Sequence, residues 1–245
     1  MGIGIISGAT SGIGKAIAKE LDLLGLEELW LIGRRGDKLT KLAIELKTHT
    51  RCFPLDLTME SSINIINDEL QQAKLEIEYL ALCAGVGYTG RVENNTSTQI
   101  KGMIDLNCNA LTQLISIALP HMSNRGKIIN IASGAGFLPQ ADFAVYAATK
   151  AYVISLSRAL RKELKEKGIK VTAVCPGPVD TEFFANLENV KEYKKKYLIS
   201  PEKVAKGSIK ASKKNKAIYT PSFSMKMLRL ASKILPTSLL LKFSK

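Results

Sequence analysis

Tyr146 and Lys150 are the residues of this sequence whose types and spacing most directly indicate chemistry. They stand four apart in the helical stretch FAVYAATKAY, so their side chains would share one face of a helix. A lysine ammonium beside a phenol stabilises the phenolate, lowers the pKa of the tyrosine and makes an inert phenol a usable acid. Ser133, which follows a predicted strand, would bond the same substrate oxygen from the other side. Taken alone, this tyrosine–lysine spacing usually means a surface pair.

A second group of such residues lies in the stretch SGATSGIG, residues 7–14. An apolar strand precedes this stretch and a helical pattern follows it, so Gly8, Gly12 and Gly14 occupy a strand-to-helix turn. The start of such a helix offers unpaired N–H groups and the positive end of a dipole, which suit a phosphate. Glycine lets the backbone approach that anion, and Gly14 would also let helix and strand pack closely. Similar turns exist without a ligand.

The residues after the second and third predicted strands bear on the cofactor. A site for NAD usually has an acidic residue after the second strand, whereas this chain has Gly33, Arg34 and Arg35. A guanidinium binds a 2′-phosphate bidentately, so Arg34 favours NADP over NAD. An exposed basic turn is the alternative, above all for Arg35. After the third strand, Asp56 would accept a hydrogen bond from the adenine amine, or it would cap the helix near Thr58.

Short apolar runs alternate with helical patterns along almost the whole chain. Strands are predicted at 2–6, 29–33, 51–55, 79–83, 127–132, 170–174 and 217–220. Helices are predicted at 12–24, 37–48, 59–74, 97–119, 144–167 and 201–213. Such alternation predicts an α/β fold, a doubly wound parallel sheet of about seven strands with helices on both faces. We expect one domain over 1–222 and a separate tail over 223–245.

Charge is distributed unevenly along the 245 residues. Residues 1–190 contain 20 Lys and Arg against 20 Asp and Glu, whereas residues 191–245 contain 15 against 2. The net charge of +13 therefore belongs to the end of the chain, and any anionic partner would be bound there.

The four cysteines and two histidines lack the spacing of a metal site. Cys52, Cys83, Cys108 and Cys175 are typical of reduced thiols in a cytoplasmic protein, and His49 and His121 are isolated. We expect no metal. No uncharged apolar run has the length of a membrane span, and with a strand beginning at the first residues we expect no signal peptide.

These motifs together resemble the short-chain dehydrogenase/reductase (SDR) family, from Met1 to about Thr181. SGATSGIG is similar to that family's TGxxxGIG turn, with Ser7 in place of threonine. Asn107 in DLNCNA, Ser133, Tyr146 and Lys150 match its Asn-Ser-Tyr-Lys tetrad in order. Cys83-Ala84-Gly85 stands where the family has Asn-Ala-Gly, and PGPVDT, residues 176–181, resembles the segment along the nicotinamide.

The resemblance implies a Rossmann-type fold and hydride transfer between a nicotinamide and a carbonyl or secondary alcohol. Tyr146 would donate the proton in reduction, Ser133 would orient the carbonyl, and Lys150 would lower the Tyr146 pKa and hold the ribose. Asn107 would hold a water that links Lys150 to solvent, or it would satisfy a helix kink. Implied cofactor contacts are Ser7, Gly8, Ser11, Gly12, Ile13, Gly14, Arg34, Arg35, Asp56, Leu57, Ala84, Gly85, Asn107, Tyr146, Lys150, Pro176, Gly177, Val179 and Thr181. Cys83 replaces the family's asparagine and so removes a polar group near the adenosine. We expect this to change how the central strand is supported there without abolishing cofactor binding.

The loop over 178–200 would cover the substrate. Its apolar residues would form a lid or merely pack the loop down: Phe183, Phe184, Leu187, Tyr193 and Tyr197. With Leu138, Pro139 and Phe143 near the tetrad, they favour an apolar ketone such as a 3-oxoacyl or steroid-like compound.

The tail has the pattern of a basic amphipathic helix. Met227, Leu230, Ala231, Ile234 and Leu235 fall on one helical face, with Lys226, Arg229 and Lys233 elsewhere, and Pro236 would end the helix. This pattern fits peripheral contact with a membrane; a dimer element, a substrate-channel element or a solvated face are the alternatives. A tail of this kind does not suit the family's tetramer, so we expect a homodimer through the helices 97–119 and 144–167.

The sequence thus predicts a cytoplasmic NADP-dependent oxidoreductase that reduces an apolar carbonyl. The alternative is an NAD-preferring alcohol or hydroxysteroid dehydrogenase that works in the oxidative direction. A nucleic-acid-binding protein is disfavoured, because the tail lacks interleaved aromatic residues and the body is neutral. A regulator that only senses nucleotides would have no use for the complete tetrad.

Overall fold

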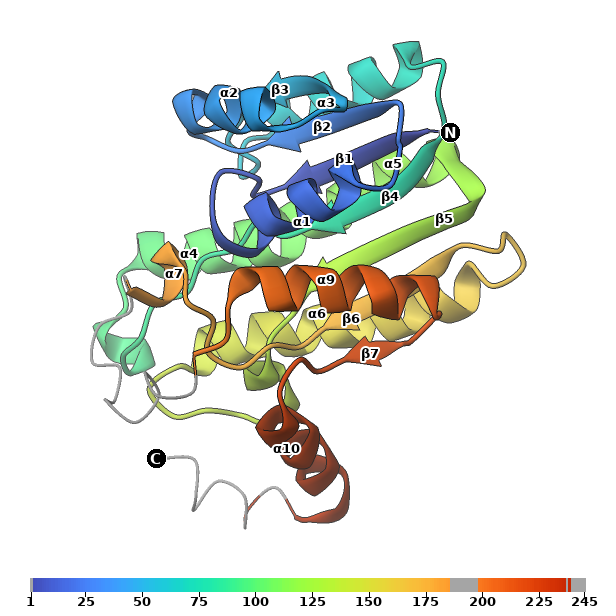
Figure 1. The fold of residues 1–245 in the computed structure, drawn as a ribbon. Helices are drawn as coiled ribbons and strands as arrows, with labels where there is room; N and C mark the ends of the chain where they lie inside the picture. The colour runs from blue at the N-terminus through green and yellow to red at the C-terminus, as the bar shows by residue number, and fades with distance from the viewer. Residues whose placement is uncertain (1, 186–197, 237, 239–245) are drawn as a thin grey trace.

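Each of the seven predicted strands is present in the computed structural model, which describes residues 2–185, 198–236 and 238. All pair in parallel in one sheet of order β3-β2-β1-β4-β5-β6-β7 (Figure 1). The strands are β1 Ile3–Ser7, β2 Glu28–Ile32, β3 His49–Phe53, β4 Ile77–Leu82, β5 Met122–Ile131, β6 Lys170–Val174 and β7 Ile218–Tyr219. The predicted doubly wound α/β fold is therefore confirmed.

The order of the strands reverses between β1 and β4. From β1 the chain proceeds outward to β2 and β3, and β4 then returns to the other side of β1, with Ser7 opposite Leu82. The chain after β1 consequently leads to a helix on one face of the sheet, and the chain after β4 leads to helices on the other face. Ligands of open parallel sheets bind at such a point, and the glycine-rich turn begins there.

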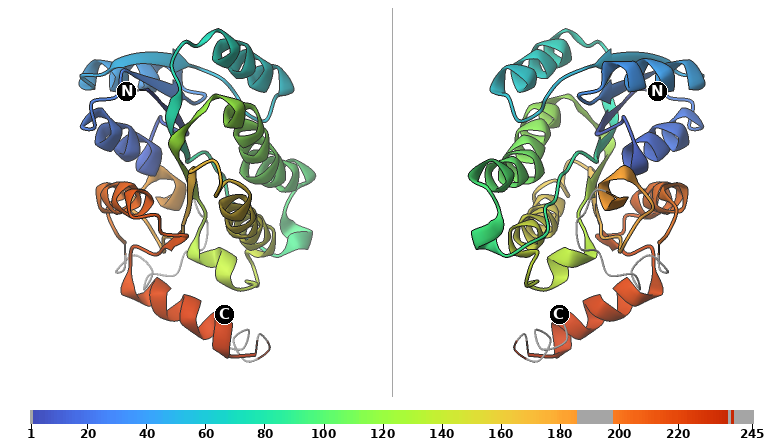
Figure 2. Two further views of the ribbon diagram at one scale, coloured as in Figure 1. Left: turned by 90° about the vertical axis from the view of Figure 1, so that its right-hand side faces the viewer. Right: turned by 90° about the vertical axis from the view of Figure 1, so that its left-hand side faces the viewer.

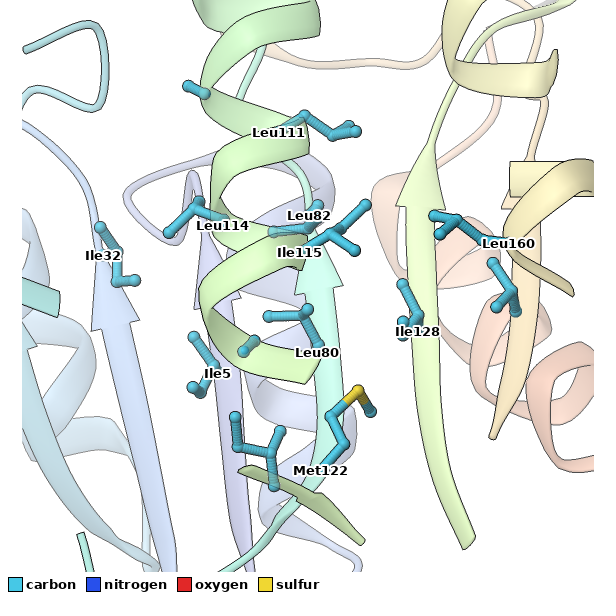
Figure 3. Packing of buried hydrophobic residues seen from close by; sticks show 14 of the residues in the cluster. Ile5, Ile32, Leu80, Leu82, Leu111, Leu114, Ile115, Met122, Ile128 and Leu160 are labelled. Atoms are coloured by element: carbon cyan, nitrogen blue, oxygen red, sulfur yellow. The ribbon is translucent and has the colours of Figure 1, made fainter. Parts of the chain in front are cut away.

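Helices cover both faces of the sheet (Figure 2). One face packs against α3 Glu60–Gln72, α5 Leu111–Ala118 and α6 Ala144–Glu163, and the other against α1 Gly12–Asp22, α2 Gly36–Glu45 and α9 Pro201–Lys213. Strand residues alternate between the two cores, as the pleat of a strand requires. In Figure 3, Ile115 of α5 lies next to Leu80 and Leu82 of β4.

The predicted helix 97–119 is divided into three segments. A capping box between Thr96 and Gln99 starts α4, Ser97–Ile104, and a π-helical segment over Asp105–Ala110 separates it from α5. The π-helical segment contains Asn107 and changes the direction in which that side chain projects. Wider turns of this kind are frequent at functional sites.

The amphipathic helix predicted in the tail is present as α10, Phe223–Ile234, and it ends before Pro236 as expected. Its Met225 contacts the carboxyl edge of the sheet: a Cβ built on Gly134 would lie 2.2 Å from the Met225 sulfur. The short helix α7, Glu182–Ala185, begins the loop predicted to cover the substrate. The predicted lid residues Leu187, Tyr193 and Tyr197, and the side chain of Phe184, lie outside the described part of the chain.

Candidate active site

The hydroxyl groups of Ser133 and Tyr146 meet at the carboxyl edge of the sheet. Ser133 follows β5 and caps a short 3₁₀ turn, Gly134–Phe137, because its Oγ accepts a hydrogen bond of 3.1 Å from the N–H of Ala135. Tyr146 is in the first turn of α6, and a side-chain hydrogen bond joins it to Ser133. Two hydroxyls in contact form a place at which one carbonyl oxygen would receive two hydrogen bonds.

Aromatic rings enclose Tyr146. Its ring stacks on that of Phe143, with ring centroids 4.3 Å apart. The ring centroid of Phe183, at the start of the loop, lies 5.6 Å from that of Tyr146. Burial raises the pKa of Tyr146 to about 12, although the Ser133 hydrogen bond lowers it in part. The expected lowering of this pKa by Lys150 is therefore wrong for this geometry, because desolvation of the phenolate outweighs the favourable contacts.

Lys150 is buried beside Tyr146, with only 5% of its surface exposed. Its Nζ donates a 3.0 Å hydrogen bond to the carbonyl of Ile131 and lies 5.6 Å from the centre of the Tyr146 ring. The shared face predicted from the sequence spacing is thus present, but the ammonium is directed mainly at the strand. Burial lowers the pKa of Lys150 to about 8.

Asn107 connects the loop after β4 to the helix of the tetrad. Its Oδ1 accepts from the N–H of Val86 at 2.9 Å, and its Nδ2 donates to the Val86 carbonyl at 2.8 Å and to Thr149 Oγ1 at 3.0 Å. Both side-chain donors are thereby used, which leaves only the second lone pair of Oδ1 for the water expected there. A Cβ on Gly85 would lie 3.1 Å from Asn107 Oδ1 and 3.3 Å from Lys150 Nζ, so glycine leaves the space between them open.

The glycines of the first turn are required by close contacts within the protein. Gly8 has φ of +68°, and a Cβ there would lie 2.7 Å from the backbone N of Ala84. A Cβ on Gly14 would lie 2.2 Å from the carbonyl oxygen of Gly8, as expected from close packing of helix and strand. Gly12, with φ of +54°, faces the methyl group of Thr181. These contacts bring the turn, the loop after β4 and the segment 176–181 together.

Ser7 and Ser11 differ in how they are used. Ser7 is buried, and its Oγ accepts hydrogen bonds from the N–H groups of Cys83 at 3.1 Å and Ala84 at 3.2 Å. Its hydroxyl therefore ties β1 to the end of β4. Ser11 is the N-cap of α1, yet its hydroxyl makes no capping hydrogen bond. The start of α1 is thus left without the side-chain cap that helices commonly have.

Arg34 and Arg35 lie in different surroundings. Arg35 donates to Glu182 of α7 at 2.7 Å and to Thr10 Oγ1 at 3.0 Å, and Lys38 contacts the same carboxylate at 2.6 Å. Hydrogen bonds from Lys38 and Arg35 lower the pKa of Glu182 to about 2. Arg34 is exposed and makes no hydrogen bond or ion pair with the residues that the structure describes. Arg34 is therefore the available cation of this turn.

Asp56 and Leu57 follow β3. Asp56 Oδ1 accepts from the Thr58 N–H at 3.0 Å and the Thr58 hydroxyl at 2.8 Å, so Asp56 forms a turn before α3 and does not cap that helix, whose N-cap is Met59. Burial opposes ionisation of Asp56, but these bonds and the charge of Arg34 hold its pKa below the usual value. Leu57 packs its side chain into the core, so only its backbone remains for a ligand.

The segment 176–181 closes the other side of the site. The Pro176 carbonyl accepts from the N–H of Gly134 at 2.8 Å, and the buried Val179 pairs with Ile199. Thr181 donates its hydroxyl to the Val179 carbonyl at 3.3 Å. These contacts hold the segment against the turn that begins at Ser133.

Sequence reasoning missed the residues that support the tetrad from a distance. Met225 of α10 covers Gly134 and Gly177, and Val86 and Thr149 bind Asn107. The role of Thr149 could have been predicted from the sequence, because it adjoins Lys150 in the motif. The role of Met225 could not have been predicted, since only the packing of α10 brings it to the site.

The residues at this edge fit a dinucleotide. The open space beside Gly85, the uncapped hydroxyl of Ser11 and the unpaired Arg34 lie along the path on which such a molecule crosses the switch point. Among the described residues, no group of three His, Cys, Asp or Glu is arranged to hold a metal ion.

Comparisons with known proteins agree with this geometry. A family profile described as short chain dehydrogenase matches residues 3–192. An uncharacterised oxidoreductase of Staphylococcus epidermidis is 35% identical over 185 residues, which cover 73% of this chain and 78% of the relative. One from Staphylococcus aureus (strain MRSA252) is 32% identical over 212 residues, covering 85% of this chain and 90% of the relative.

Solved structures extend the likeness to almost the whole chain. A short-chain dehydrogenase from Sphingobium yanoikuyae in complex with NADPH has a TM-score of 0.82 and 26% identity, covering 95% of this chain and 93% of its own. A bulky-bulky ketone specific alcohol dehydrogenase from Comamonas testosteroni has a TM-score of 0.79 and 25% identity, covering 95% and 92%.

Proposed function

The chain belongs to the short-chain dehydrogenase family, and from that premise we propose that it is an NADP-dependent reductase of apolar ketones with Tyr146 as proton donor. That it is an oxidoreductase which uses a nicotinamide cofactor follows from the family. The observation that carries the proposal is the pair of hydroxyls of Ser133 and Tyr146, hydrogen-bonded to each other beside the buried Lys150.

In the proposed mechanism both hydroxyls bind the carbonyl oxygen of the substrate and so polarise it. The nicotinamide supplies a hydride to the carbonyl carbon when it is bound. The proton of the Tyr146 hydroxyl passes to the carbonyl oxygen, which leaves an alcohol and a phenolate. Lys150, while charged, stabilises that phenolate, and Ser133 remains bonded to the oxygen throughout.

The preference for NADP rests on Arg34. Its guanidinium is exposed and unpaired among the described residues, whereas Arg35 is held by Glu182 and Thr10. A 2′-phosphate would bind a free guanidinium bidentately, and Gly33 stands where an acidic residue after β2 would repel it. The Sphingobium enzyme of similar structure was solved with NADPH.

The apolar substrate is supported by the surroundings of Tyr146. Phe143 and Phe183 pack on its ring, and Met225 of α10 lies over the neighbouring Gly134 and Gly177. A ketone with carbon substituents on both sides would bury apolar surface against these side chains. The Comamonas enzyme, with its bulky-bulky ketone specificity, is a parallel among similar structures.

We also propose a homodimer in the cytoplasm, with residues 1–222 as one domain and 223–245 as a tail that contacts membranes. Ile104 of α4 and Tyr152 of α6 are 47% and 42% exposed, which suits an interface through these helices. All four cysteines are unpaired, as in a reducing compartment. Within the described residues no helix has both the length and the apolar character needed to cross a bilayer.

The substitution Tyr146→Phe tests the chemistry. We expect NADPH to bind as before, because the ring and its packing remain, while the rate of ketone reduction falls at least a hundredfold. Fluorescence titration and turnover on the same sample measure the two effects. Ser133→Ala should lower turnover in the same way with the cofactor site intact. Activity retained by Tyr146→Phe would contradict its role as the acid.

The substitution Arg34→Glu tests the choice of cofactor. It should weaken NADPH at least tenfold, about 1.4 kcal/mol, and leave NADH unchanged or improved. Lys41→Glu, at an exposed site of α2, changes the charge equally and serves as the control. Unchanged NADPH affinity, or a wild-type protein that prefers NADH and oxidises alcohols, would support the NAD-dependent alternative.

A further inference from the structure

A second hollow lies at the opposite edge of the sheet from Tyr146. Its volume is about 440 Å³, and it is lined by the end of α6, the chain entering β6, and Asn215 before β7. Arg158, the lining residue of α6 nearest in sequence to Tyr146, stands twelve positions further along the helix, which is about 18 Å at the rise of an α-helix. The hollow is therefore separate from the candidate active site.

Cations dominate the lining of this hollow. Arg158, Arg161 and Lys162 stand on one face of α6, at i, i+3 and i+4; Lys165 follows in the turn after the helix, and Lys170 begins β6. No acidic residue lines the hollow, and none of the five cations takes part in an ion pair within the described chain. Like charges at these helical spacings repel each other.

The end of a helix explains only part of this charge. Cations in the last turn are favoured by the helix dipole, which accounts for Arg161 and Lys162. Arg158 lies a turn earlier and Lys170 is on a strand, so the dipole does not explain them. A hollow that concentrates uncompensated positive charge is the arrangement expected of a site for an anion.

Part of the wall is held in place by hydrogen bonds. Arg161 donates to Asn215 Oδ1 at 2.6 Å, to the Asn215 carbonyl at 2.7 Å and to the Val171 carbonyl at 3.3 Å. Lys170 donates to the Lys213 carbonyl at 3.3 Å. Arg158, Lys162 and Lys165 are exposed and have no such bonds to the described part of the chain, so their charged groups are available to a ligand.

We propose that this hollow binds a small molecule that carries several phosphate groups. The volume lies within the range of small-molecule sites, about 300–1,000 Å³. A guanidinium binds phosphate bidentately and lysines add point charges, so the available Arg158, Lys162 and Lys165 suit a ligand with two or three phosphates, and Arg161 and Lys170 add positive charge from the wall. Among the residues that the structure describes, no aromatic side chain lines the hollow, which argues against stacked bases and hence against a nucleic acid.

Isothermal titration calorimetry of the full chain with inorganic tripolyphosphate tests the proposal. We expect one site per chain, unchanged affinity when NADPH is present at saturation, and weaker binding as salt increases. The triple variant Arg158→Gln/Lys162→Gln/Lys165→Gln should lower the affinity at least tenfold. Arg161 is left unchanged because it holds Asn215.

A matched variant, Lys41→Gln/Lys47→Gln/Lys74→Gln, removes the same charge at exposed positions elsewhere. It should bind as the wild type does. Equal weakening in both triple variants would show a non-specific charge effect and overturn the proposal. Competition by NADPH would assign the binding to the cofactor site, and tighter binding of a twelve-nucleotide single strand would assign the hollow to nucleic acid; either result also overturns it.

Discussion

The side chains around Tyr146 keep it protonated. Its hydroxyl is buried, Phe143 and Phe183 exclude water from its ring, and its pKa is raised to about 12. A phenol of this kind retains its proton across the neutral range and is suited to donate it to a carbonyl oxygen. The opposite reaction needs the phenolate, which burial disfavours. The raised pKa of Tyr146 therefore agrees with its proposed role as proton donor.

Lys150 makes the proposed reduction dependent on pH. Burial lowers the pKa of its ammonium to about 8, so the charge that stabilises the phenolate is present below pH 8 and lost above it. We expect kcat for ketone reduction to be constant between pH 6 and 7 and to fall about tenfold per unit above pH 8. Stopped-flow assays at saturating substrate measure this profile.

The substitution Lys150→Arg is the control for this profile. Arginine keeps its charge at every pH of the assay, so the fall near pH 8 should disappear even if the rate is lower. A wild-type rate that stays constant to pH 10 would contradict the assignment to Lys150.

At the scale of elements, one hydroxyl joins the two strands at the switch point. Ser7 Oγ accepts from the N–H groups of Cys83 and Ala84, and the Cys83 N–H also reaches the Ser7 carbonyl at 3.2 Å. Ser7→Ala would leave the Ala84 N–H without its partner, so we expect the free energy of unfolding to fall by about 1–3 kcal/mol. Urea denaturation measures the loss, and Ser7→Thr should retain most of the stability. Equal stability of the alanine and threonine variants would refute this role.

Most elements of the fold could be predicted from local patterns. Apolar runs bounded by turn residues predicted the seven strands, and Pro236 predicted the end of α10. The division of helix 97–119 by a π-helical segment could not be predicted, because the sequence DLNCNA contains no helix breaker. That segment depends on Asn107 bonding to Val86, which only the folded chain brings near.

The candidate site was predictable to the extent that its residues are close in sequence or belong to a motif. The spacing of Tyr146 and Lys150 indicated a shared helix face, but it did not indicate that burial would raise the pKa of Tyr146. The ion pair of Arg35 with Glu182 joins residues 147 positions apart, and no local pattern indicates such a contact.

At the scale of the whole molecule, α10 combines exposed apolar side chains with three cations, Lys226, Arg229 and Lys233, within the basic end of the chain. Phe223, Met227, Leu230 and Ile234 are 74%, 49%, 50% and 68% exposed, and their spacing puts them on one stripe. Residues 203–245 contain eleven Lys and Arg and no Asp or Glu. A second copy of this helix would bring cations against cations, whereas an anionic lipid surface would attract them.

We therefore expect the protein to sediment with vesicles that contain phosphatidylserine and much less with vesicles of phosphatidylcholine alone. Phe223→Ser/Leu230→Ser should abolish most of this binding, because each removes apolar area that the lipid would cover. Leu23→Ser/Ile44→Ser is the matched control, since these side chains are 74% and 81% exposed, after α1 and on α2, away from the tail.

Equal sedimentation with both vesicle types would contradict an electrostatic contribution to membrane binding. Light scattering that shows a dimer lost in Phe223→Ser/Leu230→Ser would assign the stripe to a second copy, and α10 would then belong to the subunit interface.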